Sequence, residues 1–283
     1  MRSIILETAA WVAKTLPDGM RRSLYRLGPL TRGVRGLLNA AAPEGLTEIE
    51  IAAGPVVGAR MRLDLRTEKD LWLGTYELDL LQAIDDLAEA GILAYDVGAN
   101  VGYVSLAIAR AAGPAGKVVA FEPLRANFDR LRLHLEMNAE GSRVRPIQAA
   151  VGARTTRLQF LSYSSGAMGK LEGSGGRALE HTGAQEVEVI SLDDWVYQQG
   201  ESAPGLVKID VEGGEVQVLE GMERLLREAR PYLLVELHGP EAASGAQGKL
   251  ERAGYRLHEM RPGYPLWRPG PWKDYVVGIP PRS

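Results

Sequence analysis

The chain has 283 residues, of which 45% are hydrophobic and 24% are charged, which is ordinary for a soluble globular protein with one large domain and an appendage. It contains no cysteine, so disulfides, thiolate zinc sites and cysteine nucleophiles are excluded. The formal net charge is −3, and because general nucleic-acid-binding proteins carry a basic excess, no nucleic-acid partner is expected.

The first 42 residues differ from the rest in charge, with seven basic side chains against two acidic ones. Apolar residues at helical spacing predict an amphipathic helix that breaks at Pro17-Asp18-Gly19, and a second helix from Met20 to Leu38. Apolar runs are too short to span a membrane, and Glu7 and Lys14 interrupt any signal-peptide core. Two interpretations stay open: a helical cap on the domain, or a helix lying on an anionic membrane surface. The expected location is the cytoplasm, with peripheral membrane contact as the alternative.

An N-terminal extension, residues 1–70, is expected to precede a domain of residues 71–283. Alternation over residues 46–66 predicts an antiparallel hairpin with a turn at Gly54-Pro55, placed as an edge before the catalytic domain. A helix is expected from Leu71 to about Ala90. Its Tyr76 and Glu77 either form the first helical turn, where an acid complements the helix dipole, or face a cofactor or substrate.

The stretch from residue 91 to residue 123 has the pattern of one βαβ unit. An apolar run from Ile92 to Val97 stops at a glycine turn, residues 98–102, and a helix follows through Ala112. A second strand, Lys117 to Phe121, is followed directly by Glu122. Ligands of open α/β sheets bind outside the carboxyl ends of the strands, so Asp96 and Glu122 are expected to point into that crevice.

The spacing of the glycine turn distinguishes between cofactors. Asn100 stands where the dinucleotide fingerprint has its second glycine, so a pyrophosphate would fit badly. A nucleoside without phosphates suits the turn better, because Glu122 can accept both ribose hydroxyls and the turn amides can receive a carboxylate. S-adenosylmethionine has these features, and Asp96 is expected to bind its ammonium group.

The chain beyond Glu122 predicts a helix from Leu124 to Asn138 and a strand from Val144 to Val151. Within that strand, Gln148, Ala149 and Ala150 are expected to face an adenine ring. Residues 152–190 are interpreted as a β-hairpin insertion, with strands at 156–160 and 187–189 and a flexible tip at 173–176. Residues 162–166 are expected near the substrate opening, and a lid and a solvated hairpin tip both stay open.

The C-terminal third continues the doubly wound pattern. A helix from Ser191 to Tyr197, N-capped by Ser191, precedes a strand at 205–209, which should lie beside the first strand and bring Asp210 into the crevice. Lys208 is expected to face the other side of the sheet, with Asp193 or Asp194 as partner. A fifth strand, residues 232–236, leads to His238. A helix, a strand, an aromatic loop and a last strand complete the sheet; three aromatic residues of the loop line an acceptor site or cover the sheet edge: Tyr264, Trp267 and Trp272.

Three motifs in this order resemble those of the FkbM family of S-adenosylmethionine-dependent methyltransferases. They are residues 96–102, the Phe121-Glu122-Pro123 segment with Asn127 and Asn138, and residues 208–215, and the resemblance runs from about Leu71 to Leu234. Gly214 stands where relatives often have alanine. The resemblance implies a Rossmann-like class I methyltransferase fold, an α/β fold whose seven-stranded, mostly parallel sheet has helices on both faces. The expected cofactor-binding residues are Asp96, Gly98, Asn100, Gly102, Glu122, Pro123, Ala149, Ala150, Asp210, Tyr76 and Glu77.

The function expected from the residues and the resemblance is O-methylation of a hydroxyl on a glycan or a natural-product small molecule, with S-adenosylmethionine as cofactor. Methyl transfer requires alignment of donor and acceptor and removal of the acceptor proton. His238 is the expected base, with Asp210 orienting the substrate or the base, and Asp210 and Glu236 are the alternative bases. No metal ligand is assigned. A divalent metal held by Asp210, Glu236 and another oxygen donor stays open, although nothing in the spacing requires it.

Two other classes of protein stay in view. An NAD(P)-dependent oxidoreductase is disfavoured by Asn100 and by the absence of a Tyr-x-x-x-Lys pair from the sequence. A catalytically idle, membrane-associated binding protein would use the basic N-terminal arm as its working part.

Overall fold

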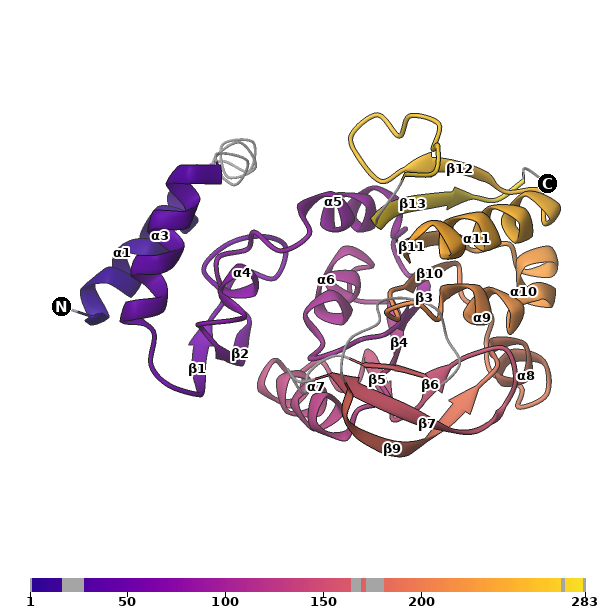
Figure 1. The fold of residues 1–283 in the computed structure, drawn as a ribbon, viewed down its shortest axis with the longest axis horizontal. Helices are drawn as coiled ribbons and strands as arrows, with labels where there is room; N and C mark the ends of the chain where they lie inside the picture. The colour runs from indigo at the N-terminus through magenta and orange to yellow at the C-terminus, as the bar shows by residue number, and fades with distance from the viewer. Residues whose placement is uncertain (1, 17–27, 164–168, 172–180, 271–272, 282–283) are drawn as a thin grey trace.

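The computed structural model describes residues 2–16, 28–163, 169–171, 181–270 and 273–281. Its centre is a seven-stranded sheet in the order β12-β13-β11-β10-β3-β4-β5 (Figure 1). The strands are β3 (Leu93–Val97), β4 (Lys117–Phe121), β5 (Val144–Ile147), β10 (Leu206–Ile209), β11 (Tyr232–His238), β12 (Arg256–Glu259) and β13 (Lys273–Ile279). Neighbouring strands are parallel except at β13, which is antiparallel to β11 and β12. The predicted class I methyltransferase fold is confirmed.

Helices cover both faces of this sheet, which explains why its central strands are almost wholly apolar. One face carries α5 (Leu78–Leu87), α6 (Tyr103–Ala111) and α7 (Arg125–Met137), and the other α8 (Leu192–Tyr197), α9 (Glu215–Glu220), α10 (Glu223–Glu228) and α11 (Pro240–Arg252). Side chains alternate between the two faces along β3: Ala94 joins the core beneath α6, while Tyr95 and Val97 join the core on the other face. The side-chain oxygen of Ser191 accepts a hydrogen bond from Asp194 N and so caps the N-terminus of α8, as predicted.

Later strands are added on both sides of β3, and this reversal of strand order positions the site. The chain runs outward through β4 and β5, then returns to β10 and continues through β11 on the other side of β3. The loops after β3 and β10 therefore turn away from one another, which opens a crevice at the carboxyl ends of the strands.

The insertion forms a second sheet and corrects one predicted strand. The predicted strand from Val144 to Val151 is two strands, because β5 ends at Ile147 and β6 (Ala150–Val151) pairs with β9 (His181–Ile190) instead. With β7 (Thr156–Tyr163) and β8 (Gly169–Leu171) these make a four-stranded sheet, in which β7 and β9 pair antiparallel as expected of a hairpin. The predicted tip, residues 173–176, and residues 164–166 of the predicted opening lie outside the described residues.

The N-terminal hairpin is not an edge of the main sheet, contrary to the prediction. β1 (Leu46–Glu50) and β2 (Arg60–Asp64) form a separate two-stranded sheet, and the connection spans residues 51–59. The helix predicted from Leu71 is also divided, into α4 (Lys69–Trp72) and α5. The physical reason is Gly74, whose φ of +64° and close approach to the carbonyl group of Ala53 interrupt helical geometry.

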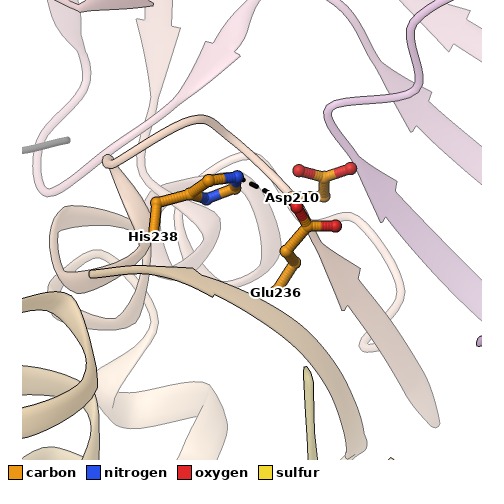
Figure 2. A group of neighbouring side chains, drawn as sticks. All are labelled: Asp210, Glu236 and His238. Carbon is orange, nitrogen blue, oxygen red and sulfur yellow. Dashed lines mark ion pairs between the residues drawn. The ribbon is translucent and has the colours of Figure 1, made fainter. Parts of the chain in front are cut away.

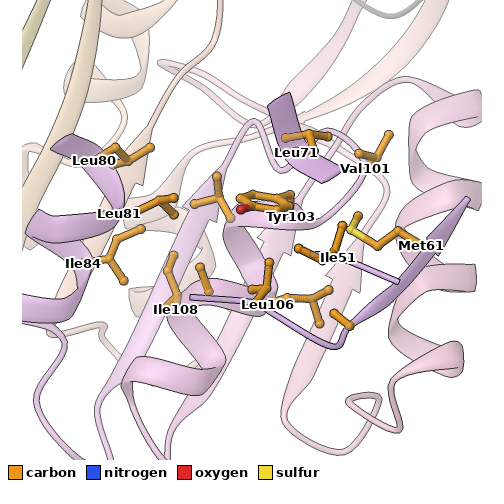
Figure 3. Close-up of a cluster of buried hydrophobic side chains, with 14 of the residues drawn as sticks. Ile51, Met61, Leu71, Leu80, Leu81, Ile84, Val101, Tyr103, Leu106 and Ile108 are labelled. Carbon is orange, nitrogen blue, oxygen red and sulfur yellow. The ribbon is translucent and has the colours of Figure 1, made fainter. Parts of the chain in front are cut away.

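The hairpin nevertheless shares its core with the main domain. Figure 3 shows Ile51 and Met61 in one apolar cluster with Leu81 of α5 and Leu106 of α6. Asn138, a residue of the second motif, donates to the carbonyl oxygen of Arg60 at 2.8 Å and so holds β2 against α7. The hairpin, residues 46–64, is therefore packed on the sheet domain.

Two N-terminal helices, α1 (Arg2–Thr15) and α3 (Gly28–Ala41), lie side by side at one end of the molecule (Figure 1). Arg35 of α3 forms a two-pronged ion pair with Asp70 of α4, at 3.0 and 2.8 Å. Helices α1 and α3 still expose several large apolar side chains to solvent: Ile4, Trp11, Val12, Val34 and Leu37. The predicted break at residues 17–19 lies outside the described residues. No helix among those residues has the length and apolar composition to cross a membrane. Both interpretations of this segment stay predictions.

Candidate active site

A cavity of about 640 Å³ opens at the carboxyl ends of β3, β4, β10 and β11. This volume is in the range of small-molecule and cofactor sites. The loops after these strands supply most of its wall, and residues of the N-terminal hairpin unit and of α4 complete it: Thr67, Glu68, Asp70 and Leu71. Sequence reasoning did not assign these four residues to the site, because only the folded N-terminal unit brings them to the sheet.

The glycine turn between β3 and α6 forms one wall of the cavity. Gly98 has a φ of +79°, and a methyl group there would lie 1.9 Å from the carbonyl oxygen of Asp210, so only glycine allows the turn to approach β10. Gly102 (φ +89°) begins α6 beneath Leu131. Asn100 adopts a left-handed φ of +49°.

The amides of this turn are already used within the protein. Those of Gly98 and Ala99 donate to the carbonyl oxygen of Phe121, that of Asn100 donates to Glu122, and that of Gly102 donates to Ala99. The prediction that turn amides receive a ligand carboxylate is therefore wrong for these four positions.

Glu122, at the tip of β4, is held in place by backbone amides. Its Oε2 accepts from Asn100 N at 2.8 Å and its Oε1 from Leu124 N at 2.9 Å, and only 4% of the residue is exposed. Burial raises the pKa of Glu122 to about 7, against the lowering effect of these hydrogen bonds. The carboxylate lines the cavity with lone pairs to spare, as expected for a ligand of two hydroxyl groups.

Small and apolar residues form the next part of the wall. Pro123 follows Glu122, Ala149 precedes β6 and Ala150 begins it, and all three residues line the cavity. Phe160 of β7 adds an aromatic side chain from the insertion. The insertion thus contributes to the cavity, whereas Trp267 of the C-terminal loop packs in the core instead of lining it.

Asp96 does not line the cavity, and this corrects its predicted role. Its carboxylate is fully buried, with Ser105 Oγ at 2.6 Å and Lys208 Nζ at 3.2 Å. Lys208 also lies 3.7 Å from Asp210, so its predicted orientation toward Asp193 or Asp194 is wrong. The reason is strand alternation, because Lys208 and Asp210 are two residues apart and share a face with Asp96 on the neighbouring strand.

Tyr76 and Glu77 line the cavity, and Glu77 also occupies the N-cap position of α5, so both interpretations of this pair stay open. Glu77 adopts a left-handed φ of +37° at the start of α5. Burial and the nearby carboxylate of Asp210 raise the pKa of Glu77. Its Oε2 is buried and has no hydrogen-bond partner within the described part of the chain.

The acidic end of the cavity contains Asp210 and Glu236, with His238 behind them (Figure 2). His238 is not part of the cavity wall, and only 6% of its side chain is exposed. Its Nδ1 lies 2.7 Å from Glu215 Oε1, and its Nε2 lies 2.9 Å from Glu236 Oε1. Burial lowers the pKa of His238, but the surrounding carboxylates, first of all Glu215, outweigh burial and the net shift is upward.

Two further charged residues at this end were not predicted. Lys273 of β13 lies opposite His238 in the antiparallel register and forms an ion pair with Glu236. Glu212 lines the cavity and lies 3.5 Å from His238 Nε2. Glu212 and Glu215 both belong to the third motif and could be recognised in the sequence. Their contacts with His238 could not be predicted, because they depend on how α9 lies against β11.

A doubly wound sheet with this strand order, and with a buried glutamate at the tip of its second strand facing the cavity, defines a class I methyltransferase. The sequence profile of the Methyltransferase FkbM domain matches residues 96–257, more than half of the chain. The protein belongs to the FkbM methyltransferase family.

Relatives within the family act on different molecules. The hexuronic acid methyltransferase AglP of Haloferax volcanii is 27% identical over 186 residues, which cover 65% of this chain and 72% of AglP. The 31-O-demethyl-FK506 methyltransferase FkbM of Streptomyces tacrolimicus is 29% identical over 179 residues, covering 55% of this chain and 68% of that enzyme. A solved FkbM methyltransferase from Methylobacillus flagellatus has a TM-score of 0.45 and 17% identity, covering 76% of this chain and 54% of that one.

Proposed function

We propose that this methyltransferase transfers a methyl group from S-adenosylmethionine to a hydroxyl group of a glycan or a natural-product small molecule. The observation that carries the proposal is Glu122, a buried carboxylate that lines the cavity and is held by two backbone amides and, at 3.4 Å, by the side-chain amide of Asn127. The relatives' names, a hexuronic acid methyltransferase and a methyltransferase of demethyl-FK506, support this class of acceptor.

In this proposal the cofactor lies along the turn between β3 and α6. Glu122 accepts the two ribose hydroxyls, and Pro123, Ala149 and Ala150 contact the adenine ring. Glu77 takes the role that the sequence assigned to Asp96: its buried, unpartnered Oε2 receives the ammonium group of the cofactor. Asp96 instead holds Lys208 beneath the turn.

The acceptor hydroxyl lies at the acidic end. The methyl carbon leaves the sulfonium sulfur as its bond to the acceptor oxygen forms, so S-adenosylhomocysteine is released and the hydroxyl proton must be removed. Asp210 is the proton acceptor in this proposal, because its side chain lines the cavity and is 20% exposed, against 5% for Glu236. His238 was the base expected from sequence; the proposal makes it a positioning residue, because Glu236, with which it pairs (Figure 2), lines the cavity and His238 does not.

Calorimetric titration with S-adenosylmethionine and with NAD tests the cofactor, and binding of NAD alone would overturn the proposal. Transfer from methyl-tritiated S-adenosylmethionine to a panel of uronic acid glycosides and macrolide polyols tests the acceptor class. With an acceptor in hand, Asp210→Asn should lower turnover by about 10²–10⁴-fold while cofactor affinity changes by less than about threefold. Asp129→Asn, which removes a surface carboxylate paired with Arg125, is the matched control. Full turnover of Asp210→Asn would exclude Asp210 as the base.

A further inference from the structure

The acidic end of the cavity brings two carboxylates and one imidazole to a common point. Asp210 follows β10, and Glu236 and His238 lie on the adjacent strand β11 (Figure 2). One ligand atom from each of the three side chains lies within 4.8 Å of the others. Two carboxylate oxygens and one imidazole nitrogen are a donor set that suits Mn²⁺ and related divalent cations.

The orientation of His238 is an independent sign of a bound ion. The Oε1 atom of Glu215, a fully buried residue, lies 2.7 Å from His238 Nδ1, and a carboxylate only accepts, so the ring proton belongs on Nδ1. In the neutral ring the lone pair is then on Nε2. That atom is buried, lies 2.9 Å from Glu236 Oε1 and 3.5 Å from Glu212 Oε2, and has neither as a hydrogen-bond partner of suitable geometry among the described residues. A carboxylate that orients a histidine so that its other nitrogen faces oxygen donors is the usual support of a metal ligand.

The charge around these residues also favours a bound cation. The described residues at this end include six carboxylates, of Glu77, Asp96, Asp210, Glu212, Glu215 and Glu236, and two ammonium groups, of Lys208 and Lys273. Burying unpaired anions is costly, and bound S-adenosylmethionine adds only one net positive charge. A divalent cation offsets two more negative charges at the point where they converge.

We propose that Asp210, Glu236 and the Nε2 atom of His238 bind a divalent cation, with Mn²⁺ as the preferred ion, and that Glu215 positions the histidine. This departs from the sequence-based assignment of no metal ligand. Lys273, which pairs with Glu236, has 37% of its side chain exposed and can move toward solvent when the ion binds. The role of the ion rests on the proposed function: at this end it would polarise the acceptor hydroxyl and ease loss of its proton to the Asp210 oxygen that does not bind the ion. Binding itself does not rest on that function.

Mn²⁺ is the probe, added to the full chain without cofactor or acceptor. Loss of the electron paramagnetic resonance signal of free Mn²⁺ should show one ion bound per chain. The bound ion should show pulsed-resonance modulation from a directly coordinated nitrogen. His238→Ala should remove that modulation and weaken Mn²⁺ binding at least tenfold, and Glu215→Gln should weaken it by about 10–100-fold while the modulation remains. His258→Ala, at a histidine bonded to the carbonyl of Tyr264, is the matched control and should change neither.

Circular dichroism and S-adenosylmethionine titration of each variant separate loss of the site from loss of the fold. Absence of bound Mn²⁺ in the wild-type chain would overturn the metal site. Unchanged Mn²⁺ binding by folded His238→Ala would also overturn it. In either case, a protonated His238 paired with Glu236 would explain the cluster. If Mn²⁺ binds at His238 but S-adenosylmethionine does not bind, the metal site stands and the proposed function fails. If S-adenosylmethionine binds but Mn²⁺ does not, the metal site fails and the proposed function stands.

Discussion

Changing Glu122 to glutamine tests the cofactor site through both affinity and pH. In the wild type, one carboxylate oxygen accepts from Asn100 N and the other from Leu124 N and, at 3.4 Å, from Asn127 Nδ2, and the residue lines the cavity. Glutamine has one acceptor oxygen, so its amide group must oppose one of those N–H donors or face the ligand hydroxyls. Hydrogen bonds to a charged group contribute about 1.5–3 kcal/mol, so Glu122→Gln should weaken S-adenosylmethionine binding by about 10–100-fold at pH 8, and Glu122→Ala should do the same.

The pKa of Glu122, about 7, adds a second signature. Ribose hydroxyls donate to the ionised carboxylate, so binding requires the proton to leave, and the dissociation constant should rise about tenfold, or about 1.4 kcal/mol, from pH 8 to pH 6. The raised pKa also has a consequence for stability. The folded protein without ligand binds this proton more tightly than the unfolded chain, so the contribution is present at acid pH and is lost as pH rises through about 7.

Titration calorimetry at several pH values between 6 and 8 measures the first effect. Glu122→Gln should bind with a flatter pH dependence, and the amino group of the ligand, which titrates in both proteins, cancels in the comparison. Glu136→Gln on the surface of α7, where the glutamate pairs loosely with Arg132 at 3.8 Å, should behave as wild type. Equal affinity of wild type and Glu122→Gln at pH 8, or the same pH dependence in both, would refute the assignment.

Two further substitutions test the support beneath the site. Asp96→Asn leaves Lys208, whose side chain is 3% exposed, without its nearer carboxylate, and should lower the free energy of unfolding by about 3–5 kcal/mol in urea denaturation; a loss below about 1 kcal/mol would contradict the buried ion pair. Gly98→Ala forces a methyl group against the carbonyl of Asp210 and should reduce both stability and S-adenosylmethionine affinity, whereas Gly214→Ala, where the nearest atom would lie 3.4 Å away, should be nearly neutral in both measurements. Equal effects of the two alanines would show that the close approach of Gly98 is not required.

The sequence by itself determined the elements of the sheet and several residues of the cavity wall. Strands buried on both faces appear as short apolar runs, so β3, β4 and β10 were predicted to within a residue. Glu122 was predictable for the same local reason: it directly follows a strand, and all parallel strands present their carboxyl ends at one edge. Residues two apart in a strand share a face, so alternation alone predicts that Lys208 lies on the face of Asp210. The predicted orientation of Lys208 toward the other face was wrong because it contradicts this alternation.

Only the tertiary structure decided which charged groups meet one another. Asp96 occupies the predicted strand end, yet Lys208 from the neighbouring strand and Ser105 from α6 enclose its carboxylate and leave it no access to a ligand. His238 was predicted to reach the substrate, but Glu215 at the start of α9 holds its ring behind Glu236. These outcomes depend on contacts between elements far apart in the chain. Propensity and periodicity act over a few residues, whereas a buried charge selects whichever partner the complete fold brings within hydrogen-bonding distance.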